Sequence, residues 1–220
     1  MTYYDFPLIL RPGTLKRFVI GVFASIILLT GQNLMAVEEA KYTVVKQQEE
    51  FEIRQYEASI VAEVVVEGDF KGASNKAFRK LFKFISGDNT RQSKIAMTAP
   101  VSQTAESEKI AMTAPVGQQA SAEGWVVSFM MPDSYTMETI PLPTDPDIRL
   151  REIPAYQAAV IEYSGTWSEK NYQKHLERLR KWVDQESLDS SGEPVWARYN
   201  APFTPWFMRR NEILIRIGSS

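Results

Sequence analysis

The two halves of this 220-residue chain repeat one another, and this repeat is the strongest constraint on the fold. A shift of 97 positions pairs Arg54 with Arg151, Ala58 with Ala155, Ala62 with Ala159, Gly68 with Gly165, and Phe70 with Trp167. Each half reads as a strand, a helix and two further strands. One helix with an incomplete sheet cannot cover its own apolar face. We therefore expect one α+β domain, in which two βαββ units pack about a pseudo-two-fold axis and two helices flank a distorted antiparallel β-barrel or sheet.

Local patterns predict the elements of each half. In the first half we expect a long strand over residues 51–70, with a possible bend, a helix over 71–85 ended by Gly87, and a strand over 125–131. In the second half we expect a long strand over 149–163, a helix over 168–186, and strands over 195–200 and 212–217. Thr166 and Glu169 have the spacing of a capping box for the second helix.

The octapeptide Lys-Ile-Ala-Met-Thr-Ala-Pro-Val occurs twice, at 94–101 and at 109–116. Its alternation is typical of a half-buried strand. Proline has no N–H for a ladder, so each copy should end at a sheet edge, a bulge or a strand terminus. A duplicated strand with a packing role accounts for the repeat. The alternative is that the thioether of Met97 or Met112 contacts a ligand.

Composition excludes several classes of function. The chain has no cysteine, which removes disulfides, thiolate nucleophiles, iron–sulfur clusters and thiolate-ligated haem. His175 is the one histidine, so a zinc site with several imidazoles cannot come from one chain. The net charge of −2, without a basic block, is not that of a nucleic-acid-binding protein. We find no nucleophile with a partner base and no phosphate-binding glycine loop, so we do not expect an enzyme.

The first 36 residues have the pattern of a secretory signal peptide. Arg11, Lys16 and Arg17 precede an apolar run over residues 18–29, and the small residue Ala36 follows a polar break. We expect export to the periplasm with cleavage after Ala36, which leaves 37–220 as the working domain. The alternative is an uncleaved anchor in the inner membrane formed by residues 18–37. Contact with a membrane is expected only through this segment.

Several stretches together resemble the SOUL haem-binding protein family. They are the strand over 51–70, the octapeptide, residues 129–132 leading into 135–141, and residues 199–207 followed by 209–212. The resemblance covers roughly residues 40–217. It implies a distorted barrel or open sheet with two helices, similar to bacterial effector-binding domains. It also implies non-covalent binding of haem or another tetrapyrrole in a mostly apolar groove, without one shared axial ligand.

A tetrapyrrole needs a flat apolar slot, with cationic or amide donors for its carboxylates. The candidate slot residues are Ala77, Phe78, Leu81 and Phe82 of the first helix and Tyr199, Pro202, Phe203 and Trp206 of the carboxy-terminal segment. The candidate partners of the carboxylates are Lys80, Lys83, Arg209 and Arg210. The alternative is that the helix residues are core and the basic residues a solvated face.

His175 is the one imidazole that could bind iron, and it lies on or beside the inward stripe of the second helix. The alternative is that this histidine, at the border of the core, is a packed residue and not an iron ligand.

The first functional hypothesis is a monomeric, non-enzymatic haem or porphyrin carrier or buffer. The second is a small-molecule-sensing or protein-interaction module whose ligand is not a tetrapyrrole, and the third is an enzyme with a strand carboxylate such as Glu162, Glu152 or Glu63.

Overall fold

The structure is a computed structural model that describes residues 37–92 and 106–218. The expected leader, 1–36, and the first copy of the octapeptide, with Met97, lie outside the described residues. The strands are β1 (Glu38–Glu39), β2 (Tyr42–Gln48), β3 (Phe51–Tyr56), β4 (Ser59–Val66), β5 (Asn89–Thr90), β6 (Thr113–Ala114), β7 (Val116–Ser121), β8 (Gly124–Met130), β9 (Leu142–Pro143), β10 (Ile148–Ile153), β11 (Tyr156–Tyr163), β12 (Ser190–Arg198) and β13 (Asn211–Ile217). The helices are α1 (Phe70–Ser86), α2 (Glu169–Gln185) and a short 3₁₀ turn, η1 (Trp206–Met208).

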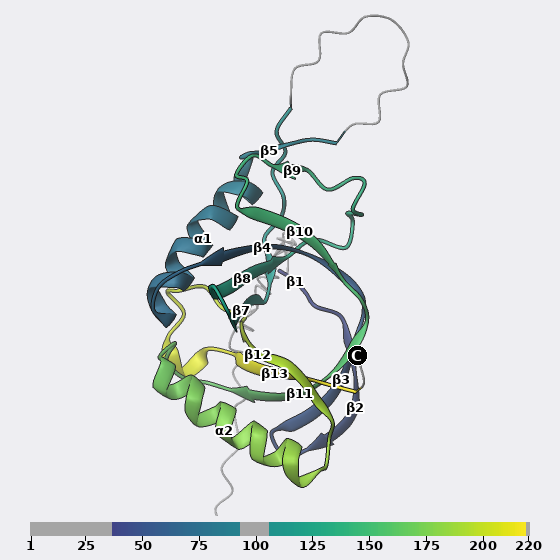
Figure 1. Cartoon of the computed structure of the whole chain (residues 1–220), viewed down its shortest axis with the longest axis vertical. Coiled ribbons are helices and arrows are strands. Elements are labelled where there is room, and N and C mark those ends of the chain that lie inside the picture. The colour runs from purple at the N-terminus through teal and green to yellow at the C-terminus, as the bar shows by residue number, and fades with distance from the viewer. Residues whose placement is uncertain (1–36, 93–105, 219–220) are drawn as a thin grey trace, which may run out of the picture. The chain divides into compact units, whose positions relative to one another are not determined.

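Nine strands form one antiparallel sheet in the order β10-β4-β8-β7-β12-β13-β11-β3-β2. The sheet is strongly curved, and α1 and α2 lie on its outer face (Figure 1). It stays open between β10 and β2, so the expected α+β fold is confirmed as a curved sheet rather than a closed barrel. Within the described ranges, no helix is both long and apolar enough to cross a membrane.

The strand order confirms the duplication. β3 and β10 have the same bounds after a shift of 97 positions, as do β4 and β11, and α1 and α2 each have 17 residues. The halves exchange their first strands, because β10 pairs with β4 and β3 pairs with β11. β7 and β12 pair at the centre of the sheet, where the two halves meet. Each half therefore needs the other to complete its sheet.

The two long predicted strands are each divided. The first breaks at residues 57–58 into β3 and β4, and the second breaks at 154–155 into β10 and β11. Phe70 is the first residue of α1 rather than the last of a strand. The break lets one continuous segment pair with both halves of the sheet. Gly68 and Gly165 follow β4 and β11 with positive φ angles of 134° and 125°, which glycine adopts without steric cost.

The helix ends agree with the sequence in α1 and differ in α2. The Asp69 side chain accepts a hydrogen bond from the Gly72 N–H, and Gly87 caps the other end of α1 as predicted. The capping box predicted for α2 is wrong. Ser168 is the N-cap, since its backbone is extended and its hydroxyl accepts a hydrogen bond from the Asn171 N–H at 3.2 Å.

The second octapeptide does not form the predicted alternating strand. Thr113 and Ala114 form a short strand, β6, which pairs in parallel with β1, and Val116 begins the next strand, β7. The Thr113 hydroxyl donates to the Met130 carbonyl, which turns this threonine inward, while Met112 is 41% exposed. Pro115 separates β6 from β7, as expected for a proline at a strand terminus.

Three apolar clusters surround the sheet. One lies under α1 and one under α2, and Phe70 joins the two halves by stacking on Trp196 at 4.8 Å and meeting Trp125 edge-on at 5.2 Å. The third lies on the inner face, around Tyr56 and Leu214. The outer face is therefore filled beneath each helix, and space is left where the helices diverge.

Candidate ligand-binding groove

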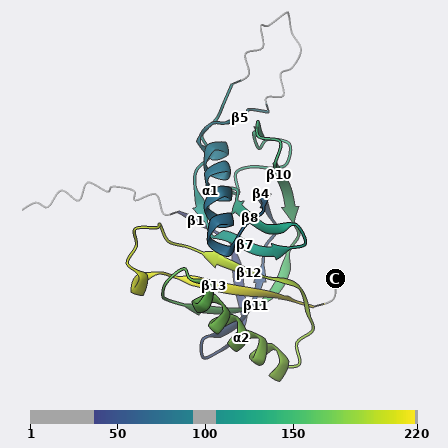
Figure 2. The same ribbon diagram turned by 60° about the vertical axis from the view of Figure 1, so that its left-hand side comes forward.

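A groove of about 520 Å³ lies on the outer face, between the start of α1 and the turn before α2. Its lining residues are Lys71, Ser74, Asn75 and Phe78 of α1, Val116 of β7, Thr166, Trp167 and Ser168 before α2, and Arg198, Asn200, Pro202 and Arg209 at the ends of β12 and β13. The floor is formed where Val116 pairs with Arg198. β7 and β12 lie between α1 and α2 in Figure 2. The groove thus sits over the junction of the two halves.

Arg198 forms the charged part of the floor. Strand alternation places it on the same face as Trp196, and its guanidinium lies 4.7 Å from the centroid of the Trp196 ring and 5.5 Å from that of Trp167. Within 37–92 and 106–218, its Nε and Nη2 atoms are buried and have no hydrogen-bond partner. Burial lowers the pKa of Arg198 to about 10, so the side chain remains protonated at neutral pH.

Buried donors without partners are costly, and a buried cation more so. An anion from the groove would supply the missing acceptors, and a carboxylate can accept two parallel hydrogen bonds from one guanidinium. Lys71 in the first turn of α1 and Ser168, the N-cap of α2, also line the groove, and helix amino termini favour negative charge. The electrostatics of this groove therefore suit an anionic group.

The wall opposite α1 is held in place by several contacts. The guanidinium of Arg209 lies 4.2 Å above the Trp167 ring, and it donates to the carbonyls of Thr204 and Pro202, each at 2.8 Å. The indole N–H of Trp167 donates to Asn211 at 2.7 Å. The apolar wall is therefore fixed before a ligand arrives.

The structure brings three of the predicted site residues together: Phe78 and Pro202 of the candidate slot, and Arg209 of the candidate carboxylate partners. Ala77 and Leu81 are fully buried in the core under α1, while Phe82 is 46% exposed and stacks on Phe78 at 6.0 Å. Phe203 and Trp206 extend into solvent, with 89% and 59% of their surface exposed. Lys80 forms ion pairs with Asp145 and Asp147. Lys83, in the last turn of α1, does not line the groove.

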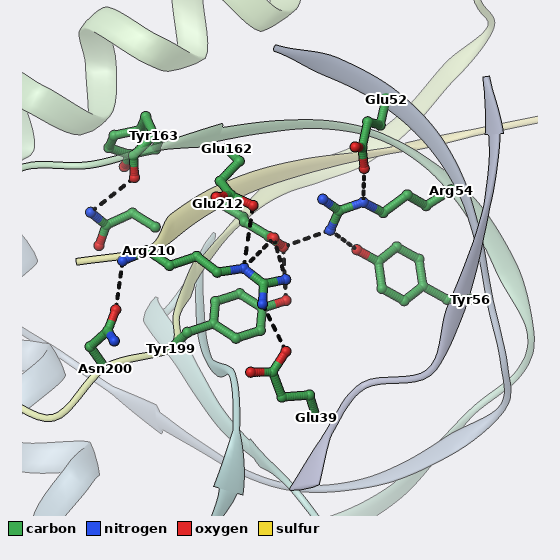
Figure 3. A network of polar contacts seen from close by, with 11 residues as sticks. Glu39, Glu52, Arg54, Tyr56, Glu162, Tyr163, Tyr199, Asn200, Arg210 and Glu212 are labelled. Carbon is green, nitrogen blue, oxygen red and sulfur yellow. Dashed lines mark hydrogen bonds and ion pairs between the residues drawn. The ribbon is translucent and has the colours of Figure 1, made fainter. Parts of the chain in front are cut away.

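Tyr199 and Arg210 belong to a separate polar network on the inner face (Figure 3). Its centre is Glu212, whose carboxylate is fully buried. This carboxylate accepts hydrogen bonds from Arg54 at 2.9 Å, from the Tyr199 hydroxyl at 2.8 Å and from Arg210 at 2.7 and 3.0 Å. Arg210 also contacts Glu39 at 2.8 Å. Since carboxylates of the domain already surround Arg210, it is not the residue that needs an external anion.

His175 is packed rather than open to a ligand. Its ring stacks on Tyr163 with the centroids 4.0 Å apart, and it does not line the groove. Burial, together with Arg178 and Lys174, lowers its pKa, which favours the neutral imidazole. No group of three or more histidine, cysteine or acidic residues within the described ranges could hold a metal ion.

Sequence reasoning missed Arg198 and Trp167. A signal for Arg198 was present, because β12 alternates and Trp196 two residues earlier is a core residue on the same face. Trp167 was aligned with Phe70 in the duplication, but the structure gives it a different role. Phe70 bridges the two cores, whereas Trp167 lines the groove.

A groove with apolar walls and a cationic floor, on a duplicated α+β scaffold, is the arrangement of a small-molecule-binding domain. Residues 37–216 match the model of the SOUL heme-binding protein family, and the chain belongs to that family. Heme-binding protein 1 of Xenopus tropicalis is 26% identical over 167 residues, which are 74% of this chain and 81% of the relative. The Xenopus laevis protein of that name has the same identity and coverage.

Solved structures share the fold at low sequence identity. The C-terminal domain of EcmrR has a TM-score of 0.55 and 12% identity, over 81% of this chain and 99% of that domain. EcmrR in a complex with DNA has a TM-score of 0.54 and 11% identity, over 77% of this chain and 57% of EcmrR. At these identities the likeness shows the fold alone.

Proposed function

We propose that this chain is a non-enzymatic carrier or buffer for haem or a related tetrapyrrole, exported to the periplasm, and that the ligand binds non-covalently in the groove. The observation that carries the proposal is Arg198 in the floor of the groove, whose buried Nε and Nη2 atoms have no hydrogen-bond partner among the described residues. Tetrapyrroles such as haem combine a flat apolar ring with carboxylates. Membership of the SOUL family supports this ligand class.

The groove is suited to the ring and to its carboxylates. Its volume of about 520 Å³ lies within the range of about 300–1,000 Å³ common for small-molecule sites. Phe78 and Trp167 supply aromatic surface, Arg198 can donate hydrogen bonds to a carboxylate, and Lys71 adds positive charge. The lining residues include no histidine, methionine or tyrosine. We therefore expect the protein to bind the macrocycle with or without iron.

The test is a titration with haemin, protoporphyrin IX and protoporphyrin IX dimethyl ester, followed by the Soret band and by tryptophan quenching. The ester keeps the ring and removes the carboxylate charges. We expect saturation near one equivalent for haemin and protoporphyrin IX. Loss of one charge-assisted hydrogen bond is worth about 1.5–3 kcal/mol, so the ester should bind about 10–100-fold more weakly.

Arg198→Met should remove most of this preference, and Lys71 is then the remaining positive charge on the α1 side of the groove. The variant should fold at least as stably as the wild type, because it replaces an unpaired buried charge by an apolar side chain. Arg180→Met, at an exposed position of α2, is the matched control.

His175→Ala should leave the affinity for haemin within about threefold. Equal binding of acid and ester by the wild type would remove the role of Arg198, and no saturable binding of any ligand would contradict the tetrapyrrole proposal and favour a sensing or interaction module.

A further inference from the structure

The loop between β12 and β13 presents four large apolar side chains to solvent. Phe203, Trp206, Phe207 and Met208 are 89%, 59%, 60% and 65% exposed. They lie close together in sequence, at and just before the η1 turn, and Trp206 meets Phe207 edge-on at 5.6 Å. Single exposed apolar residues are common, but a group of this size on one loop indicates a surface that contacts a partner.

This loop is held in a defined conformation. Arg209 donates to the carbonyls of Pro202 and Thr204, and the Arg210 N–H donates to the Asn200 side chain at 2.5 Å. The Gly165 N–H donates to the Trp206 carbonyl at 3.0 Å, which ties the loop to the turn before α2. The apolar side chains are thus displayed from a fixed backbone rather than folded back onto the core.

The amino-terminal sequence indicates what the loop contacts. The apolar run over residues 18–29, preceded by three basic residues, is a membrane-directed segment and ends shortly before Val37, the first described residue. From there the chain enters β1, where Glu39 pairs with Arg210 at 2.8 Å. Arg210 closes the loop, and Figure 3 shows Glu39 beside it. The chain therefore arrives from its membrane-directed segment at the base of the loop.

The charges near the loop favour apolar insertion over electrostatic attraction. Phe207 and Met208 share a surface depression with four glutamates, Glu49, Glu50, Glu52 and Glu162. Three of these are ion-paired: Glu50 with Arg178, Glu52 with Arg54 and Glu162 with Arg210. Arg209 and Arg210 line the same depression, but Arg209 donates to carbonyls of the loop and Arg210 pairs with Glu162. Since neither arginine adds an unpaired basic patch, a neutral phospholipid surface is the partner that the loop matches.

We propose that Phe203, Trp206, Phe207 and Met208 insert into the interfacial region of a neutral phospholipid bilayer. Tryptophan and phenylalanine are the side chains typical of this region. Pro202 and Arg209 join the loop to the groove, so insertion brings the groove to the bilayer surface. This contact would let a tetrapyrrole pass between the groove and the lipid without crossing water, an inference that rests on the proposed function.

The absence of native cysteine allows a direct test on the full chain. Phe207→Cys, labelled with the environment-sensitive dye NBD, is mixed with phosphatidylcholine vesicles that carry brominated acyl chains. Glu193→Cys, at an exposed position toward the other end of β12, is the matched control, and the amino-terminal segment tethers both variants equally. We expect a blue shift and quenching of the dye at position 207, and neither at position 193.

Equal behaviour at the two positions would overturn the proposal. So would a blue shift at position 207 that needs no vesicles and grows with protein concentration, because it would assign the loop to contact with a second copy. Phe203→Cys gives an independent second probe position and should behave like position 207. None of these measurements uses a tetrapyrrole. The membrane proposal can therefore fail while the ligand-binding function stands, and the ligand-binding function can fail while the membrane proposal stands.

Discussion

Glu212 is the residue whose removal should cost the most stability. Its fully buried carboxylate accepts hydrogen bonds from Arg54 and Arg210, and Arg54 is only 2% exposed. Removing one partner of a buried ion pair leaves the other charge uncompensated, which costs about 3–5 kcal/mol. We expect Glu212→Gln to lower the free energy of unfolding by about this amount, measured by urea denaturation.

Glu162→Gln is the control for this prediction, since the Glu162 side chain is 54% exposed and lies 3.4 Å from the same Arg210. Exposed ion pairs contribute at most about 1 kcal/mol, so this change should be nearly neutral. Similar values for the two variants would mean that the buried network does not stabilise the fold.

At the scale of single residues, the sequence predicted part of the groove lining and missed part of it. Phe78 and Arg209 were identified and line the groove. Arg210 follows Arg209 directly, yet contacts Glu212 on the inner face, and nothing local distinguishes the two arginines. Arg198 was not selected, although its alternation with Trp196 placed it on the core-facing side of β12; the structure adds that its Nε and Nη2 atoms are buried.

Among the elements, the first turn of α1 offers a clear prediction. The Asp69 side chain satisfies the Gly72 N–H at 2.6 Å, one of the donors that a helix start leaves without a partner. Asp69→Ala should cost about 0.5–2 kcal/mol of unfolding free energy, measured by thermal or urea denaturation. Asp69→Asn should cost much less, because asparagine is an equally good N-cap. An equal loss in both variants would place the contribution of Asp69 in its charge rather than in the cap.

Element identity was predictable, and strand pairing was not. The 97-residue shift correctly matched β3 with β10 and β4 with β11. The sequence could not reveal that the first strand of each half pairs with the second strand of the other half, since hydrophobic alternation marks which face is buried and not which neighbour is paired. The second octapeptide shows a related limit, because its alternation resembles a strand although only two of its residues pair with β1.

For the whole molecule, the duplication determines where a ligand can bind. Two helices related by a pseudo-two-fold axis cover the two ends of one sheet face and diverge over β7 and β12, so the groove falls at the junction. The cationic character of the floor does not follow from the repeat, since Arg198 of β12 pairs there with the apolar Val116 of β7.

The amino-terminal segment gives the last prediction. As a helix, its apolar run of twelve residues would span roughly 18 Å at about 1.5 Å per residue, short of the hydrocarbon core of about 30 Å. Strand pairing in the described domain starts at Glu38, so cleavage after Ala36 leaves every described pair intact. We expect the chain expressed in a bacterial host to have the intact mass of residues 37–220, and Ala36→Arg, which removes the small residue before the cut, to retain the leader. A wild-type mass that includes residue 1 would favour the uncleaved anchor. If the leader is removed, the apolar loop at 203–208 becomes the one proposed membrane contact of the described domain, and vesicle binding by the cleaved chain should depend on it.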